Sequence, residues 1–257
     1  MIGFIDSSLA GLEVVRAFRD HLPGHDLLFF ADTARGPYSG KSLETIQRFA
    51  EEGIQKLSDL GATRIIASCP AISSLAAAGL IGSPHVPIVN IVEPAAEEAV
   101  HVSKRQQIGI LGANNSLEAD AYQKMIWKFN ANAKVFTASS ALIESVAAEG
   151  WMNKPQAAMI AKKYLHPLRI RQIDTLILAR PDHRPMMKII QRKIGKRVRI
   201  IEPWEITAAR TSAESITPES AVEKAGNLRV FVTDLSFSLE KYARIFYDRK
   251  IRMEKSS

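Results

Sequence analysis

The chain has 257 residues, 46% of them hydrophobic, which is enough apolar material for one large domain or two small ones. No apolar run is long enough to cross a bilayer, and the first residues lack the basic and apolar blocks of a signal peptide. The single cysteine excludes an internal disulfide, so we expect a reducing, cytoplasmic setting.

The chain is basic, and its charge is unevenly distributed. The formal net charge is +7, and much of the excess lies in residues 188–200 and 242–255. A basic surface can meet nucleic acid, anionic lipid or acidic ligands. Because neither a zinc-ligand spacing nor an aromatic RNA-binding signature accompanies it, we interpret it as a solvated, Lys-rich face.

Short β-rich apolar runs alternate with longer amphipathic segments. The expected strands are residues 1–6, 26–32, 63–69, 86–92, 106–111, 134–139, 173–178, 197–203 and 229–234. The expected helices are residues 11–22, 42–61, 73–81, 94–104, 116–129, 153–168 and 238–249. Ser42 is a typical helix N-cap, and Gly61 is a typical helix stop. The alternation predicts an α/β fold with mainly parallel sheets.

The second half of the chain resembles the first. Residues 2–8 (IGFIDSS) match residues 108–114 (IGILGAN), and residues 62–72 match residues 174–183. We interpret this as two pseudo-symmetric, doubly wound α/β domains. Because ligands bind at the carboxyl ends of parallel strands, the candidate site loops are residues 6–11, 32–42, 68–74, 112–116 and 180–185. We expect these loops to meet in a cleft between the domains.

Several stretches together resemble one known family. They are IGFIDSSLAGLEVVRAFRDHLP, LLFFADTARGPYSGKSLETI, IIASCPAISS, VPIVNIVEPA, IGILGANNSLEADAY, YLHPL with IDTLILARPDHRP, and RVFVTD. In this order they are similar to the glutamate racemases of the aspartate/glutamate racemase superfamily. The resemblance implies one domain of residues 1–97 and 207–257 and another of residues 98–206, with the last helix packed on the first domain.

The resemblance also implies a racemase that needs no cofactor and no metal. In that family two cysteines flank the α-carbon of the substrate: one removes the proton as a thiolate, and the other returns a proton to the opposite face. The Cα–H bond is a very weak acid, so it needs a well-placed base and a site that stabilises negative charge. Thiols suit this role because nearby charges tune their pKa.

The resemblance assigns roles residue by residue. Cys69 matches the first catalytic cysteine, Asp6 and Ser7 match the Asp-Ser pair that contacts the substrate amino group and orients the thiol, and His183 matches the histidine after the second cysteine. The expected catalytic residues are therefore Cys69, His183 and Asp6. The expected substrate-binding residues are Ser7, Pro37, Tyr38, Ser39, Glu93, Arg180 and Asp182.

The chain departs from the family pattern where the chemistry takes place. The family's second cysteine falls in Gly-Cys-Thr-His-Tyr-Pro, whereas this chain has ARPDHRP, one residue longer, which puts Arg180 or Pro181 at the cysteine. Arginine stays protonated and cannot exchange a proton near neutral pH. Pro70 and Ala71 replace the Asn-Thr pair that holds the substrate carboxylate. Asp182 stands as an alternative second base.

Each candidate also has a simpler structural explanation. Cys69 could be a small buried hydrophobe, and Asp6 and Ser7 could cap the helix near residue 11. Residues 34–42 could be a plain turn. His183 could be an exposed loop histidine, or it could form an acid/base pair with Asp182. Arg180 could be a surface charge, or it could bind a substrate carboxylate.

Glu93 could likewise mark only the start of a helix, where negative charge is favoured.

Three functions follow from these alternatives. The first is glutamate racemisation that supplies D-glutamate for peptidoglycan. The second is a one-base isomerase or lyase in which Cys69 acts alone or with His183. The third is a catalytically inactive homologue with a binding or regulatory role. Each would bind a small acidic amino acid or carboxylate. The resemblance also implies a homodimer and, as in some family members, contact with DNA gyrase or nucleic acid.

Overall fold

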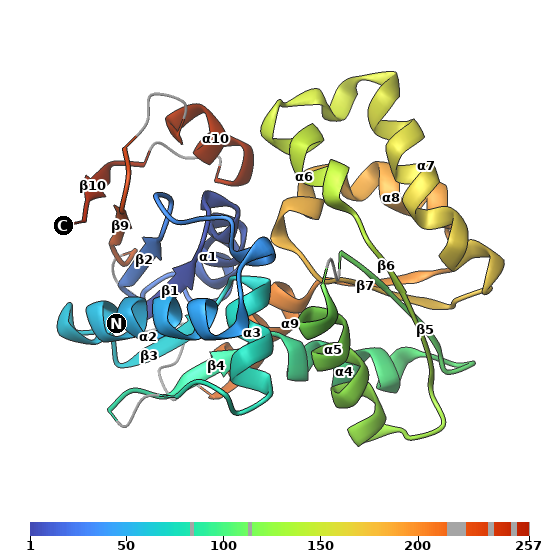
Figure 1. Cartoon of the computed structure of the whole chain (residues 1–257), viewed down its shortest axis with the longest axis horizontal. Coiled ribbons are helices and arrows are strands. Elements are labelled where there is room, and N and C mark those ends of the chain that lie inside the picture. Colours follow the sequence, from blue (N-terminus) through green and yellow to red (C-terminus); the bar gives the residue numbers. More distant parts are fainter. Residues whose placement is uncertain (83–84, 113–114, 215–224, 236–238, 248–250, 257) are drawn as a thin grey trace. The chain divides into compact units, whose positions relative to one another are not determined.

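The computed structural model describes residues 1–82, 85–112, 115–214, 225–235, 239–247 and 251–256 (Figure 1). The chain divides into two compact units. Unit 1 comprises Met1–Ile91 and Trp204–Ser257, and unit 2 comprises Val92–Pro203. The domain limits expected from the resemblance, and the cleft between the domains, stay predictions.

Unit 1 is built on a six-stranded parallel sheet with the order β10-β9-β2-β1-β3-β4. Its strands are β1 Ile2–Asp6, β2 Leu27–Ala31, β3 Arg64–Ala67, β4 Ile88–Asn90, β9 Leu228–Val232 and β10 Met253–Lys255. Its helices are η1 Leu9–Gly11, α1 Leu12–His21, η2 Tyr38–Gly40, α2 Leu43–Asp59, α3 Pro70–Ala77, α9 Pro203–Glu214 and α10 Leu239–Phe246.

Local sequence signals explain much of unit 1. Every residue of β1 and β2 is buried, as expected for central strands of a sheet covered on both faces. Ser42 caps α2, because its hydroxyl accepts the N–H of Thr45 at 3.3 Å, and this confirms the predicted cap. The last helix, α10, packs against η1 and α1 of unit 1, as expected.

Unit 2 is built on a four-stranded parallel sheet with the order β6-β5-β7-β8. Its strands are β5 Gln107–Leu111, β6 Lys134–Ala138, β7 Thr175–Leu178 and β8 Arg199–Ile201. Its helices are α4 Val92–Val102, α5 Ser116–Phe129, α6 Ala141–Ala148, η3 Trp151–Asn153, α7 Pro155–Ile170, η4 Pro181–Met186 and α8 Met187–Ile194. Because parallel crossovers are right-handed, α7 and α8 cover one face of this sheet and α5 covers the other.

The order β6-β5-β7-β8 repeats the order β2-β1-β3-β4 of unit 1. The first strand of each unit lies between the second and third strands in both cases. The prediction of two pseudo-symmetric α/β units with mainly parallel sheets is confirmed.

Some expected boundaries were wrong, and the helices α6, α8 and α9 were missed. The helix expected to begin at residue 73 begins at Pro70, because proline fits the first helical turn, where its missing N–H costs nothing. The strand expected over residues 63–69 ends at Ala67 for the same reason. Residues 113–114 of an expected site loop, and residues 238, 248 and 249 of the last expected helix, lie outside the described residues.

Candidate functional site

The unit 1 site forms where the chain reverses direction across the sheet. β1 lies between β2 and β3, so the crevice beyond the carboxyl ends of β1 and β3 is a topological switch point, the usual ligand position in such sheets. β1 ends at Asp6 and is followed by Ser7, and two residues after the end of β3 the chain reaches Cys69. The fold thus brings together three residues that the sequence analysis selected.

Asp6 is buried and held in place by its own loop. Its Oδ1 accepts the backbone N–H of Ser8 at 2.9 Å and the Ser8 hydroxyl at 3.2 Å. A Cβ at Gly11 would lie 2.5 Å from Asp6 Oδ2, so only glycine allows this approach. Ser8, whose hydroxyl accepts the N–H of Ala10, performs the capping that the sequence alternative gave to Asp6 and Ser7.

Cys69 follows β3 and is the N-cap residue of α3. Its backbone N–H donates to the carbonyl oxygen of Ile5 at 3.2 Å, and its Sγ lies 3.4 Å from the Ser7 hydroxyl. Burial, followed by the charge of Asp6, raises the pKa of the Cys69 thiol to about 12, although Ser7 and the N–H groups of Ile72 and Ala71 act in the opposite direction. In the free protein the thiol is therefore neutral at neutral pH.

The loop after β2 is anchored on a buried carboxylate that the sequence analysis did not select. Asp32 is fully buried; its Oδ2 accepts the Tyr38 hydroxyl at 2.5 Å and Arg35 Nε at 2.6 Å, and its Oδ1 accepts the Thr233 hydroxyl at 3.0 Å. Burial and Asp32 raise the pKa of Tyr38, so its phenol stays a proton donor. An Asp directly after a wholly apolar strand is the sequence signal that could have revealed this anchor.

The same loop approaches Ser7 closely. A Cβ at Gly36 would overlap the carbonyl oxygen of Ser7, so the glycine permits the two loops to touch. The peptide bond between Gly36 and Pro37 is cis. Pro37 is exposed, Tyr38 is buried and Ser39 is half-buried. The segment is thus a specifically anchored loop beside Ser7, and not only a plain turn.

In unit 2 the corresponding edge carries different chemistry. Arg180 lies just after β7, and its Nη2 and Nε donate to Asp182 Oδ2 at 3.2 and 3.3 Å. The Arg180 side chain is only 11% exposed, so it is not a free surface charge. This ion pair joins the Arg180 guanidinium to one oxygen of Asp182, and the roles of both residues toward a ligand stay predictions.

His183 is completely buried, which excludes the exposed-loop alternative. Its Nε2 and the Ser140 hydroxyl are 2.7 Å apart. Burial, opposed by Asp182 and assisted by Arg180, lowers the pKa of His183 to about 4, so the ring is neutral at neutral pH. The ring packs against Gly112, where a side chain would overlap it.

Glu93 lies in the first turn of α4 in unit 2. Its Oε1 accepts Lys128 Nζ at 2.7 Å, and both side chains are well exposed. The position matches the helix-start explanation, since negative charge is favoured at the N-terminus of a helix.

Cys69 and Arg180 occupy the same position in the two repeats. Each follows the third strand of its unit, with one residue between, and each precedes a proline at the first position of a helix. The residue before each one, Ser68 or Ala179, donates its N–H to a carbonyl of the unit's first strand. The repeat therefore pairs Cys69 with Arg180, and Pro70 with Pro181.

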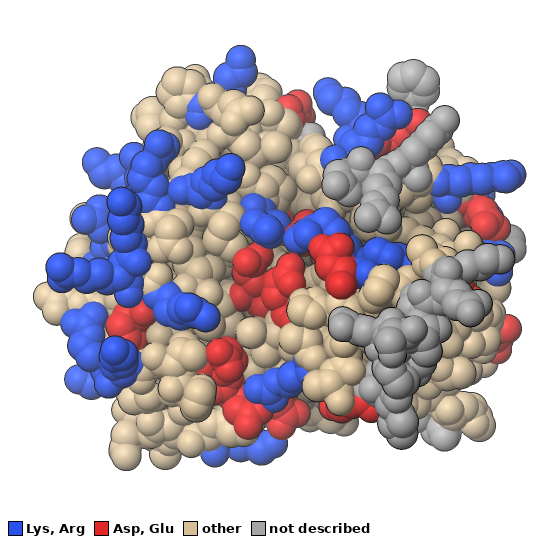
Figure 2. All heavy atoms as spheres, turned by 180° about the vertical axis from the view of Figure 1, so that it is seen from behind, with Lys and Arg blue, Asp and Glu red and all other residues tan. Residues whose placement is uncertain are grey.

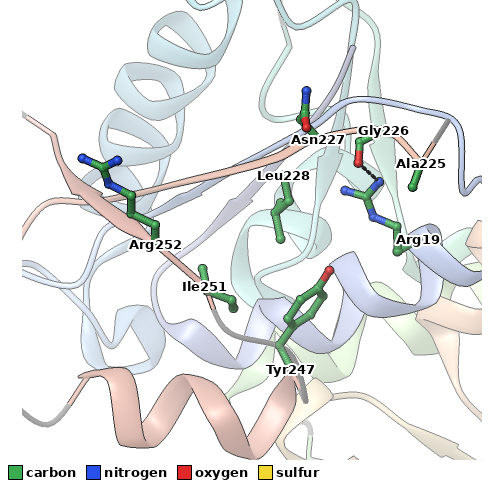
Figure 3. Close-up of a pocket in the computed structure, with 8 residues that line it drawn as sticks. All are labelled: Arg19, Ala225, Gly226, Asn227, Leu228, Tyr247, Ile251 and Arg252. Carbon is green, nitrogen blue, oxygen red and sulfur yellow. Dashed lines mark hydrogen bonds between the residues drawn. The ribbon is translucent and has the colours of Figure 1, made fainter.

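A cavity of about 240 Å³ in unit 1 lies elsewhere (Figure 3). It is next to Leu228, the first residue of β9, and so lies at the amino edge of the sheet, away from Asp6 and Cys69. Arg19 lines it and donates to the carbonyl oxygen of Gly226 at 2.5 Å. None of the expected site residues lines this cavity.

Among the described residues, none of the helices combines the length and apolarity that crossing a bilayer requires. The same part of the chain holds no group of three or more His, Cys, Asp or Glu side chains placed to bind a metal ion. The two parallel sheets, each with its first strand between the second and third, define a two-unit α/β protein of the doubly wound type.

Comparison with known proteins gives the family. Residues 5–211 match the family described as Asp/Glu/Hydantoin racemase. The chain is 31% identical over 256 residues to glutamate racemase of Geobacter metallireducens, covering 97% of this chain and 93% of that protein. It is 28% identical over 261 residues to glutamate racemase of Syntrophus aciditrophicus, with the same coverage of 97% and 93%. The chain belongs to the Asp/Glu racemase family and, within it, to the glutamate racemase family.

Solved structures of glutamate racemases have the same fold. Glutamate racemase RacE1 of Bacillus anthracis has the same fold, with a TM-score of 0.90 at 24% identity over 100% of this chain and 97% of that one. Glutamate racemase of Thermus thermophilus, in complex with beta-chloro-D-alanine, has a TM-score of 0.84 at 26% identity over 100% and 96%.

Proposed function

We propose that the chain binds a small acidic amino acid, with glutamate first among the candidates, at the unit 1 edge around Asp6, Ser7 and Cys69, and exchanges its α-proton from one face only. The observation that carries the proposal is the pairing of Cys69 with Arg180 in the two repeats. Inversion by two thiols needs a second proton donor, and the chain has one cysteine. An arginine cannot replace it, since its guanidinium stays protonated.

The choice of ligand rests on the family and its relatives. A structurally similar glutamate racemase of Francisella tularensis was solved with D-glutamate, and the Thermus relative with an amino-acid analogue. In this chain the buried carboxylate of Asp6 lies at the switch point, where it suits an ammonium group. That ammonium group would also lower the pKa of Cys69, because an opposite charge stabilises the nearby thiolate.

The chemical step is a proton transfer between Cα and sulfur. The Cys69 thiolate takes the α-proton, so the C–H bond breaks, an S–H bond forms and the electron pair stays on the α-carbon. The same thiol then returns a proton from the same side. The original enantiomer is regenerated, with exchange against solvent protons at the sulfur.

The alternative to single-face exchange is the role that the family implies, which is the supply of D-glutamate for peptidoglycan. That role requires net inversion at the α-carbon. His183 is the other expected proton carrier, but its ring is buried against Ser140. A catalytically inactive homologue is the third possibility. A second copy of the chain and DNA gyrase stay predictions as partners.

The test is proton NMR in D2O with L-glutamate and, separately, D-glutamate, alongside Cys69→Ala. We expect deuterium at Cα with retained configuration, lost in Cys69→Ala. The opposite enantiomer would establish inversion and refute the single-face proposal. No exchange, with glutamate binding still detected by calorimetry, would leave a binding protein without this activity.

A further inference from the structure

The strongest charge asymmetry in the molecule lies in one stretch of unit 2. Residues 154–199 contain thirteen Lys and Arg against two Asp, a net charge of +11, whereas the whole chain carries +7. Both acidic residues of this stretch have other partners than the basic residues of α8. Asp182 accepts from Arg180, and Asp174 accepts the Ser103 hydroxyl at 2.6 Å. Asp182 compensates Arg180 and Glu202 compensates Arg184, so the excess positive charge lies on the other basic residues of the stretch.

The fold collects this charge on two helices that pack together. α7 and α8 contact each other along their lengths, and their exposed sides carry the basic residues. We define the basic face by six exposed residues: Lys162, Lys163, Lys188, Arg192, Lys196 and Arg197. Figure 2 shows Lys and Arg crowded on the side of the molecule where Figure 1 places α7 and α8. Among the described residues, none of the six forms an ion pair with a carboxylate.

We propose that this basic face binds the phosphate backbone of double-stranded nucleic acid without reading its sequence. The proposal does not depend on the amino-acid site, which lies in unit 1. Sixteen residues of α7 extend about 24 Å at 1.5 Å per residue, enough to follow on the order of seven base pairs of a duplex. Lys and Arg on such a surface displace counterions from phosphates, which drives sequence-independent binding.

Two observations favour a duplex over other anionic partners. The apolar residues Ile190 and Ile194 of α8 are buried in unit 2, so α8 has no apolar side to insert into a membrane, whereas α7 exposes Met159 and Ile170 near its two ends. The only Phe, Tyr or Trp in residues 154–199 is Tyr164, which is half-buried and accepts the N–H of Leu142. The exposed Trp151 lies in η3, before α7 and outside the six residues of the basic face, so the basic face itself supplies none of the stacking platforms typical of single-strand binding.

The test uses the full chain and a fluorescein-labelled 20-base-pair DNA duplex, with binding measured by anisotropy at several salt concentrations. The variant Lys188→Glu/Arg192→Glu/Arg197→Glu is compared with Lys104→Glu/Lys124→Glu/Lys255→Glu, which changes the same net charge at exposed residues elsewhere. We expect the first variant to weaken binding at least tenfold. We also expect the slope of log K against log salt concentration to become less steep by roughly one to three. We expect the control to change affinity less than threefold.

A second variant on α7, Lys162→Glu/Lys163→Glu, keeps the test decisive if the first does not fold. Equal weakening by the control would overturn the proposal, because only overall charge would then matter. So would the lack of duplex binding at low salt, or tighter binding to vesicles containing phosphatidylserine than to the duplex. Different duplex sequences should bind with the same affinity.

Discussion

The hydroxyl of Ser7 lies 3.4 Å from the Sγ of Cys69, and the two residues follow neighbouring strands, β1 and β3. This contact, together with the helix N–H groups, favours the thiolate, whereas burial and Asp6 favour the thiol. The balance keeps Cys69 protonated, with little thiolate available to act as a base, until a cation enters the site. Substrate binding and activation of the thiol are thus coupled in the proposed chemistry.

The reactivity of Cys69 should respond to its two neighbours in opposite directions. Asp6→Asn removes a negative charge, lowers the pKa of the thiol and should speed alkylation by iodoacetamide at pH 8 several-fold. Ser7→Ala removes a hydrogen bond to the thiolate, raises that pKa and should slow alkylation. Mass spectrometry of the intact protein measures both rates. Ser39→Ala in the neighbouring loop should leave the rate unchanged, and equal rates in all four proteins would refute this account.

The stability of the protein should fall at acidic pH because of His183. Its pKa is about 4 in the folded protein and near 6.5 when unfolded, so the unfolded chain binds an extra proton between these values. The contribution of neutral His183 to the free energy of unfolding is complete above pH 6.5. It is lost as the pH falls toward 4, which lowers the free energy of unfolding by up to about 3 kcal/mol.

Urea unfolding from pH 7 to pH 4.5 tests this dependence on His183. The His183→Gln protein should show a smaller drop in free energy of unfolding than the wild type over that range. The same substitution at the exposed His166 serves as the control and should keep the wild-type slope. An unchanged slope in His183→Gln would show that another group is responsible.

The Tyr38 hydroxyl should stabilise the loop beside Ser7. Tyr38→Phe leaves the buried carboxylate of Asp32 with one donor fewer, which should lower the free energy of unfolding by about 1–3 kcal/mol. Chemical denaturation measures the change. Tyr247→Phe is the control, because that hydroxyl faces the cavity in Figure 3, and it should cost less. Equal losses in both variants would argue against a specific role for Asp32.

Gly112 should be intolerant of any side chain. Its φ is +99°, and a Cβ there would overlap the His183 ring and lie 2.9 Å from Arg180 Cγ. Gly112→Ala should therefore destabilise the protein by more than 2 kcal/mol. Gly79→Ala is a matched control, since Gly79 has φ +69° but open space around it. Thermal unfolding of both variants separates the cost of steric overlap from the cost of a positive φ at alanine. Equal losses of stability in the two variants would exclude the overlap with His183 and Arg180 as the cause.

Much of the fold could be predicted because strand and helix periods are local. The buried runs of β1 and β2, the Ser42 cap and the two-unit repeat were all evident before the structure. Helices α6 and α8 were missed because short segments with mixed polarity depend on packing for their stability. The placement of Arg180 at the position of Cys69 needed the strand register, since the sequence left Arg180 and Pro181 equally open.

By itself, the sequence determined the α/β class, the repeat, the single thiol and the polar residues at strand ends, because each depends on residues close together in the chain. Only the tertiary structure decided that Thr233 bonds to Asp32, 201 positions earlier, because β9 pairs with β2. It also decided that His183 is buried and neutral, and that α7 and α8, which both carry exposed basic residues, pack against each other. Burial and long-range hydrogen bonds follow from the sheet order, which no local pattern encodes.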